Sequence, residues 1–258
     1  MISIVILGNG RMARYLVKQL YSHPQLEIVQ WYMREPCGDE NQFGVSMTTS
    51  LDQVDQSADL YIICISDDAI PTLAQQLAVD GLVVHTAGSV SIDALAPLTR
   101  RGVFYPLQTL GEETSSKLSQ IPLCLEASQE SDRALLERIA QAVEATHYWI
   151  DSAQRQILHL AAVLTNNFTN HLYTLSANLC EKHQIPFEIL HPLILETAQK
   201  IKHLHPRNTQ TGPALRNDQN TLNNHLGLLD DKTLKTLYQL FTQSIQHQHE
   251  EKLQNTTQ

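Results

Sequence analysis

The chain opens on an apolar run that turns sharply into an amphipathic segment. Residues 2–7 are nearly all apolar and rich in β-branched side chains, which predicts a buried strand. Gly8 follows at once, and from Arg11 to Tyr21 the apolar residues recur at helical spacing. The pattern therefore predicts a strand, a tight glycine turn and a helix at the beginning of the chain.

Alternating strand and helix patterns continue to about residue 150. Helices are expected to begin near Leu51 and Ala69, the second of them capped by Asp67 or Asp68. Such an alternation predicts an α/β domain with a mostly parallel sheet. The further strands are expected at 27–33, 45–48, 59–65, 81–85, 102–106, 123–126 and 147–150, with a helix over 132–145.

After residue 150 the sequence shows helical patterns and no strand. A long helix is expected over 153–182, capped by Asp151 or Ser152. Three more helical segments are expected at 186–204, 217–229 and 232–249. The sequence therefore predicts a second, all-α domain over residues 151–258, after an α/β domain over residues 1–150.

The first turn carries a nucleotide-binding pattern. Gly8-x-Gly10-x-x-Ala13 fits the G-x-G-x-x-G/A form, placed between a strand and a helix. Gly8 allows the sharp turn, Gly10 lets the backbone approach a pyrophosphate, and Ala13 lets the helix pack against the strand. The alternative is a glycine turn that binds nothing. We expect a Rossmann dinucleotide-binding domain whose phosphates meet the segment Gly8, Asn9, Gly10, Arg11, Met12 and Ala13.

The second strand indicates which dinucleotide is bound. It ends near Met33 and is followed by Arg34, whereas NAD sites usually place a carboxylate there. A guanidinium suits the 2′-phosphate of NADP, so we expect NADP (NADPH). Glu35 either pairs with Arg34 or accepts from the ribose. At later strand ends, Ser66, Ala87 and Gly88 are candidates to line the nicotinamide ribose, with plain turn chemistry as the alternative.

Composition narrows the function classes. The net charge of -9, without a basic stripe, argues against nucleic-acid binding. No run approaches the roughly 20 apolar residues of a membrane span, and no basic segment precedes the first apolar run, so neither a membrane segment nor a signal peptide is expected. The histidines lack zinc-ligand spacing, so no metal site is expected. The scattered cysteines Cys37, Cys64, Cys124 and Cys180 are expected to be reduced thiols of a cytoplasmic protein.

The long helix carries polar residues on a face that should be buried at a domain seam. At about 100° per residue, His159, Val163, Asn166 and Asn170 fall within a narrow arc, and Asn167 flanks it. Buried polar groups need partners, which a bound substrate can supply. The alternative is a polar network between helices or subunits.

The only Gly-Pro pair of the second domain precedes two charged residues. Gly212-Pro213 forces a turn, and Arg216 and Asp218 follow it. Arg216 suits a carboxylate or phosphate of a substrate. The alternative is an Arg216–Asp218 pair that fixes the loop.

Four segments together resemble a known family. They are His159-Leu-Ala-Ala-Val163 with Asn167-Phe168, Tyr105-Pro-Leu-Gln-Thr109, His85-Thr-Ala-Gly88 and Thr211-Gly-Pro-Ala-Leu-Arg-Asn-Asp218. With these segments the whole chain resembles bacterial Rossmann-like proteins with a C-terminal DUF2520 domain, which are described as NADP oxidoreductases. The resemblance implies a helical domain like those of 6-phosphogluconate dehydrogenase, pyrroline-5-carboxylate reductase and ketopantoate reductase, which usually dimerise.

One position departs from the wider superfamily. The β-hydroxyacid dehydrogenases place Lys-x-x-x-Asn on the first helix of the second domain. If Asn167 is that asparagine, Val163 stands at the lysine position and the usual proton donor is absent. Its role would have to pass to His159 or to another residue.

These observations predict an NADPH-dependent oxidoreductase acting on a small carbonyl or imine that carries a carboxylate. His159 is the expected acid/base, because histidine titrates near neutral pH, and Asn167 is expected to orient the substrate. The alternative is a regulatory protein that binds NADP without turnover. The expected substrate contacts, converging with His159 on one cleft, are Tyr105, Gln108, Asn170, Thr211, Arg216 and Asp218.

The last helices predict the assembly. They carry more apolar residues than one compact helical layer can bury, and exposed apolar patches mark interfaces. We therefore expect a homodimer formed mainly through the helical domain. The residues concerned are Leu226, Leu229, Leu234, Leu237, Leu240 and Phe241.

Overall fold

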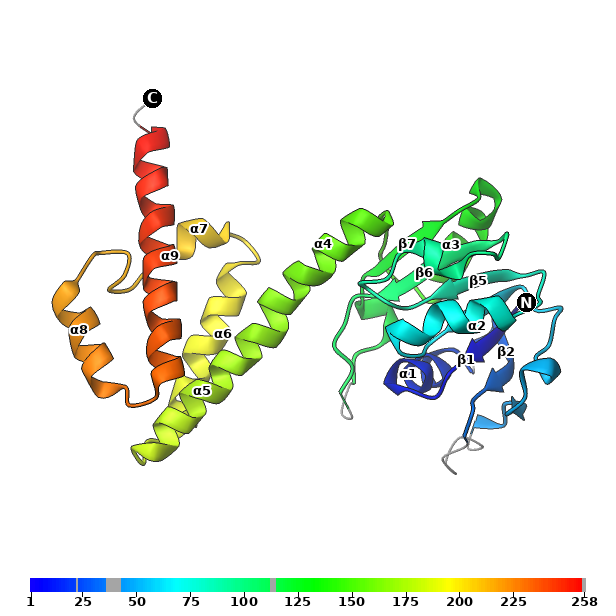
Figure 1. The fold of residues 1–258 in the computed structure, drawn as a ribbon, viewed down its shortest axis with the longest axis horizontal. Helices are drawn as coiled ribbons and strands as arrows, with labels where there is room; N and C mark the ends of the chain where they lie inside the picture. The colour runs from blue at the N-terminus through cyan, green and yellow to red at the C-terminus, as the bar shows by residue number, and fades with distance from the viewer. Residues whose placement is uncertain (22, 36–42, 112–114, 257–258) are drawn as a thin grey trace. The chain divides into compact units, whose positions relative to one another are not determined.

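A computed structural model describes residues 1–21, 23–35, 43–111 and 115–256 (Figure 1). Its contacts divide the chain into two compact units, Met1–Thr165 and Asn166–Gln258. The sequence places the domain boundary at residue 150, where the sheet ends, whereas the contacts divide the chain later, inside the long helix. Cys37 lies outside the described residues.

The first unit is built on one eight-stranded sheet, and the predicted α/β class is confirmed. Its strand order is β3-β2-β1-β4-β5-β6-β7-β8, and only the β6–β7 pair is antiparallel. The first six strands follow the order of dinucleotide-binding folds, in which ligands bind at the carboxyl ends where the order reverses. The strands are β1 (Ile2–Leu7), β2 (Leu26–Tyr32), β3 (Met47–Thr48), β4 (Leu60–Ile63), β5 (Leu82–His85), β6 (Arg101–Pro106), β7 (Leu123–Ala127) and β8 (His147–Trp149).

Helices cover both faces of this sheet. On one face, α1 (Arg11–Leu20) and α3 (Glu130–Ala142) pack on side chains such as Ile4 and Ile6. On the other face, α2 (Ile70–Gln76) packs on Val5 and Leu7, with short 3₁₀ helices completing the layer. Successive strand residues thus enter opposite cores, which explains why the central strands are apolar throughout.

The long predicted helix is present, but it is not regular. It consists of α4 (Ser152–Ala162), a π-helical segment (Val163–Phe168) and α5 (Thr169–Lys182). Asp151 caps it as expected, because the Gln154 N–H donates to its carboxylate at 2.8 Å. The wider π turn falls where the two compact units divide. The arc drawn at 100° per residue is therefore wrong beyond Val163, since a π turn holds more residues than an α turn.

The described residues of the second unit form helices joined by loops and contain no strand. After α5 come a 3₁₀ turn (Phe187–Leu190), α6 (His191–Lys200), α7 (Pro206–Thr209), α8 (Gln219–Leu228) and α9 (Lys232–Thr256). The short α7 was not expected. Among the described residues, no helix is long and apolar enough to cross a membrane.

Candidate functional site

A large pocket lies at the carboxyl ends of β1, β2 and β4, the position that the strand order favours for a ligand. Its volume is about 1020 Å³, at the upper end of the range for ligand sites. Seven of the predicted cofactor contacts line it: Gly8, Asn9, Gly10, Arg11, Met12, Arg34 and Ser66. Ile65 and Thr86 line it as well.

Glycine is needed at the two positions of the first turn for different physical reasons. Gly8 has a φ of +125°, and a Cβ there would lie 2.3 Å from the Cys64 carbonyl oxygen, so the fold itself requires glycine. Gly10 has an ordinary φ of −76°, and its nearest neighbour to a Cβ is the same oxygen at 3.8 Å. The protein leaves open the space that a Cβ at Gly10 would fill. This space fits a pyrophosphate approaching the N-terminus of α1.

Two buried neighbours hold the turn in place. Ala13 is fully buried between α1 and the sheet, in the packing role expected for it, and does not line the pocket. The Trp31 indole Nε1 donates to the Gly8 carbonyl at 2.6 Å. Sequence inspection did not single out Trp31, because an aromatic residue at that position of a strand is typical of any core.

Arg34 lies beyond β2 with its side chain exposed at the pocket. No ion pair joins Arg34 to Glu35 within the part of the chain that the structure describes, so of the two alternatives for Glu35 the pairing with Arg34 is not observed. The Glu35 backbone carbonyl accepts from the Asn9 amide at 3.4 Å. The Arg34 guanidinium therefore lies at the pocket and forms no ion pair with a carboxylate of the described residues.

The turns after β4 and β5 are joined by a side-chain contact. The Ser89 hydroxyl donates to the Asp67 carboxylate. The helix that follows β4 has no side-chain cap, so the predicted capping by Asp67 or Asp68 is wrong. Asp67 instead connects two loops at the carboxyl edge of the sheet, a contact between distant segments that the local sequence pattern does not reveal.

Tyr105 and His159 form a contact pair beside this edge. The Tyr105 hydroxyl lies 3.2 Å from His159 Nδ1, and the two rings meet edge to face. Gly88 packs against both, since a Cβ on it would lie 2.6 Å from His159 Nδ1 and 2.8 Å from Tyr105 Cζ. Thr86, which lines the pocket, is two residues before Gly88. Three predicted site residues, from β6, α4 and the turn after β5, are thus brought together next to the pocket.

Ala87 and Gly88 are placed differently from the expectation. Neither is among the residues that line the pocket, and both are buried. The Ala87 N–H donates to His85 Nδ1 at 3.2 Å. Their structural role is to shape the turn on which Tyr105 and His159 rest, and their contact with a nicotinamide ribose stays a prediction.

A buried ion pair anchors α4 one helical turn before His159. Arg155 is fully buried, and its guanidinium donates to the Glu126 carboxylate of β7 and to the Val90 carbonyl. Ser152 also donates to Glu126, at 2.8–3.0 Å. Residues four apart share a helix face, so this anchor sets the position of His159. The sequence alone gave no signal for Arg155, because its partner is far away in the chain.

His85 is a buried, neutral histidine at the end of β5. Its side chain is inaccessible to solvent, and burial, with a smaller effect of the nearby Arg155 charge, lowers its pKa from 6.5 to about 4. The neutral ring is what allows Nδ1 to accept from Ala87. His85 therefore acts as an uncharged support for the turn that carries Gly88.

Replacing His85 by asparagine should flatten the pH dependence of stability. In the unfolded chain His85 binds a proton below its ordinary pKa of 6.5, whereas in the folded protein it stays neutral down to about pH 4. The contribution of His85 to the free energy of unfolding is therefore fully present above pH 6.5 and is lost as the pH falls. Between pH 7 and pH 5 this linkage amounts to about 2 kcal/mol. An asparagine at position 85 does not titrate and can still accept from the Ala87 N–H, as in an Asx turn.

Urea unfolding at both pH values measures the effect. The His85→Asn variant should lose about 2 kcal/mol less than the wild type on going from pH 7 to pH 5. Parallel losses in the two proteins would show that His85 is not held neutral in the fold.

The remaining predicted site residues are distributed over two places. Gln108 is exposed after β6, and its side chain accepts from the neighbouring Thr109 N–H at 2.9 Å. The others belong to the second unit and are Asn167, Asn170, Thr211, Arg216 and Asp218. Because the two units are described separately, the convergence of these five residues with His159 stays a prediction.

Within the second unit, the loop before α8 is fixed without an Arg216–Asp218 ion pair. Asp218 caps α8, accepting from the Thr221 N–H at 3.1 Å and from its hydroxyl at 2.7 Å. These hydrogen bonds, more than the Arg216 charge, lower the pKa of Asp218. Asn217 takes a positive φ of 51°. Among the described residues, Arg216 is exposed and forms no ion pair, so its guanidinium is accessible to an anion.

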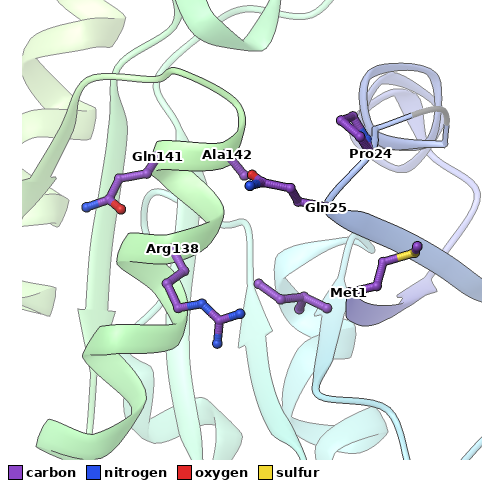
Figure 2. A pocket seen from close by; sticks show the side chains of 7 residues that line it. Met1, Pro24, Gln25, Arg138, Gln141 and Ala142 are labelled. Atoms are coloured by element: carbon purple, nitrogen blue, oxygen red, sulfur yellow. The ribbon is translucent and has the colours of Figure 1, made fainter.

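A second, smaller pocket lies at the opposite edge of the sheet (Figure 2). It has a volume of about 560 Å³ and includes Met1 and Gln25, which precede β1 and β2, together with Arg138 of α3. It is therefore at the amino ends of the strands, away from the glycine turn. In the described residues, no cluster of histidine, cysteine, aspartate or glutamate side chains could hold a metal ion. The chemistry of the first unit is thus concentrated at the carboxyl edge.

A family model matches the end of the sheet together with most of the helical unit. Residues 121–245 match the model described as "Domain of unknown function (DUF2520)". Comparison with curated proteins gives no match.

Solved structures resemble the whole chain. The "putative NADP oxidoreductase BF3122" of Bacteroides fragilis is 40% identical, with a TM-score of 0.85 over 95% of this chain and 98% of that protein. Protein TM1727 of Thermotoga maritima is 20% identical, with a TM-score of 0.73 over 96% and 99% of the two chains. A reductive aminase of Aspergillus terreus, in complex with NADPH and ethyl levulinate, is 14% identical, with a TM-score of 0.68 over 96% and 94%.

The last two similarities concern the fold alone, whereas the first extends to the sequence over nearly the full length of both chains. The chain therefore belongs to the family of Rossmann-like proteins with a DUF2520 domain.

Proposed function

We propose that this protein is an NADPH-dependent oxidoreductase that acts on a small carbonyl or imine substrate carrying a carboxylate. The observation that carries the proposal is the juxtaposition of the glycine-turn pocket, open at Gly10 and bordered by Arg34, with the Tyr105–His159 pair. A nucleotide pocket alone accounts only for nucleotide binding. A nucleotide pocket next to a pair of side chains that can exchange protons is suited to catalysing a reduction. The B. fragilis relative, described as an NADP oxidoreductase, and the A. terreus reductive aminase support the same reading.

The protein's residues have separate tasks in this proposal. NADPH, when bound, supplies the hydride. His159 supplies the proton that the reduced carbonyl oxygen or imine nitrogen requires, because it is partly exposed beside the pocket edge. Asn167 orients the substrate by hydrogen bonds, and Arg216 binds its carboxylate.

Turnover separates this proposal from its alternative. The purified protein is incubated with NADPH and a panel of small keto acids, aldehyde acids and cyclic imino acids, and the nicotinamide absorbance is followed. Consumption of NADPH by the wild type that is lost in the His159→Ala variant would support the proposed oxidoreductase activity. Tight NADPH binding without consumption of any panel member would favour an NADP-sensing regulatory protein, which Val163 at the superfamily's lysine position keeps open.

Replacing Arg34 by alanine should weaken NADPH binding far more than NADH binding. The exposed guanidinium at the pocket suits the 2′-phosphate that distinguishes the two nucleotides. Losing a charge-assisted contact should cost roughly 1.5–3 kcal/mol, or about ten- to a hundredfold in affinity for NADPH. Nicotinamide fluorescence titrations with both nucleotides measure it.

A matched variant at the next residue tests the opposite assignment. Glu35→Gln removes a carboxylate from the same pocket edge and should leave NADPH affinity almost unchanged. Equal losses for NADPH and NADH in Arg34→Ala, or a selective loss of NADH binding in Glu35→Gln, would place the ribose on Glu35 instead.

We further propose that the protein is a homodimer formed through its helical unit. That unit has little core of its own: among its described residues the buried apolar side chains are Ala214, Leu222 and Leu229. Large apolar side chains of the same unit are more than half exposed, including Phe168, Ile189, Leu193 and Leu195. Leu229 is buried within the chain, whereas Leu240 and Phe241 are exposed and are retained as interface residues. So much exposed apolar surface is typical of a subunit interface.

Light scattering at micromolar concentration should give twice the chain mass of 29.1 kDa. Leu193→Glu, which places a charge on the exposed apolar surface of α6, should shift the protein toward the monomer. Gln199→Glu adds the same charge to an exposed polar position of that helix and should not. A monomeric wild type at these concentrations would contradict the proposal.

A further inference from the structure

The Tyr105–His159 contact constrains where the protons of the histidine lie. Tyr105 is in β6 with 8% of its surface exposed, and its hydroxyl lies 3.2 Å from His159 Nδ1. Within the described residues, His159 is the sole hydrogen-bond partner of that hydroxyl. A tyrosine hydroxyl can donate or accept, but a buried hydroxyl that only accepted from Nδ1–H would leave its own proton without a partner. Donation to Nδ1 satisfies that proton and places the imidazole proton on Nε2.

The surroundings keep this arrangement. Burial raises the pKa of Tyr105, so its hydroxyl stays protonated and remains a donor over the physiological range. Gly88 allows the close approach, because a Cβ there would come within 2.6 Å of His159 Nδ1. Arg155, held by Glu126 and the Val90 carbonyl, fixes the helix one turn before His159. Each of these contacts restrains the ring while leaving Nε2 outside the Tyr105 contact.

We propose that Tyr105 is a positioning residue that holds neutral His159 with its proton on Nε2 and directs that N–H to the substrate. The sequence alone predicts a substrate contact for Tyr105. The proposal rests on the proposed function in one respect, the identity of the group that Nε2 meets: a carbonyl oxygen or an imine nitrogen.

The same pair suits the proton transfer itself. When the ring is cationic, the Tyr105 hydroxyl turns and accepts from the Nδ1–H, so the two atoms stay bonded and Nε2 still carries a proton. Transfer of the Nε2 proton to the substrate leaves a neutral ring with its remaining proton on Nδ1. A solvent proton that returns to Nε2 restores the cationic ring and replaces the proton given to the substrate. A carboxylate in place of Tyr105 could only accept, and would favour a permanent Nδ1–H.

Nitrogen NMR of the full-length protein, without nucleotide or substrate, tests the proposal. In protein labelled with ¹⁵N-histidine, the signals absent from His159→Gln identify this residue. At a pH where the ring is neutral, the wild type should show an unprotonated Nδ1 and a protonated Nε2. In Tyr105→Phe, which retains the ring and its packing, the two signals should move toward the tautomer mixture of the solvent-exposed histidines.

Two further variants complete the experiment. Tyr148→Phe removes a hydroxyl from an exposed tyrosine of β8 and should leave the His159 signals unchanged. Gly88→Ala, which forces the two rings apart, should reproduce the Tyr105→Phe spectrum. A proton on Nδ1 in the wild type, or identical His159 signals in the wild type and Tyr105→Phe, would overturn the proposal. Because no substrate is present, absence of turnover would contradict the proposed function while leaving this result intact.

Discussion

Replacing Gly10 by valine is expected to abolish binding of both NADPH and NADH. A Cβ at Gly10 would meet the Cys64 carbonyl oxygen at 3.8 Å, an ordinary contact, and the residue's φ of −76° suits any side chain. The protein can therefore accommodate a larger residue here. The branched side chain would instead occupy the space over the N-terminus of α1, where the pyrophosphate must approach the backbone. We expect affinity for both nucleotides to fall by about a thousandfold or more, over 4 kcal/mol.

Fluorescence titration measures this loss of affinity. Variants at two other glycines show whether the loss comes from a blocked binding site or from a damaged fold. Gly8→Val would place a Cβ 2.3 Å from a backbone oxygen at a positive φ, so its loss of binding would reflect a damaged fold. Gly227→Val, in α8, adds the same side chain where nothing lies within 4 Å, and should bind as the wild type does. Retained nucleotide affinity in Gly10→Val, with a folded protein, would remove the glycine turn from the binding site.

The regular part of the fold could be predicted because its signals are local. β1, the glycine turn and α1 follow from the apolar run, Gly8 and the helical spacing after it, and the structure places each within a residue or two of the expected bounds. The Asp151 cap was predicted correctly, because a cap depends on the residues next to it. The role of Asp67 was predicted incorrectly, because its carboxylate accepts a hydrogen bond from Ser89 of another loop.

The candidate site shows the same division. The residues around the pocket could be named from one motif and from the strand ends, since a parallel sheet brings its carboxyl ends to one edge. The Tyr105–His159 contact joins residues 54 positions apart, and the role of Gly88 depends on how closely they approach. The π turn at Val163–Phe168 changes which side chains share a face of the helix, although the segment contains no glycine or proline that would indicate an irregular turn. Such features depend on tertiary contacts rather than on a local period.

Removing one partner of the buried Arg155–Glu126 pair is expected to destabilise the first unit by about 3–5 kcal/mol. Arg155 is fully buried, and 15% of the Glu126 side chain is exposed, so Glu126→Gln leaves a guanidinium without its counter-charge and away from water. The Val90 carbonyl and the Ser152 hydroxyl, which also accept from Arg155, are neutral and cannot replace the carboxylate. Arg155→Met should cost less than Glu126→Gln, because Glu126 retains some contact with solvent and the two hydrogen bonds from Ser152.

A double-mutant cycle distinguishes the pair from its separate parts. The cycle uses the single variants Glu126→Leu and Arg155→Met and the double variant Glu126→Leu/Arg155→Met. The double variant replaces the ion pair by apolar side chains of similar size, and its loss of stability should be smaller than that of Glu126→Leu alone. Urea unfolding followed by tryptophan fluorescence reports on the first unit, because Trp31 and Trp149 both lie in its sheet. The ¹⁵N signals of His159 provide a second reading, since α4 carries both Arg155 and His159. Additive losses, with His159 unaffected in Glu126→Gln, would mean that the ion pair neither stabilises α4 on the sheet nor positions the histidine.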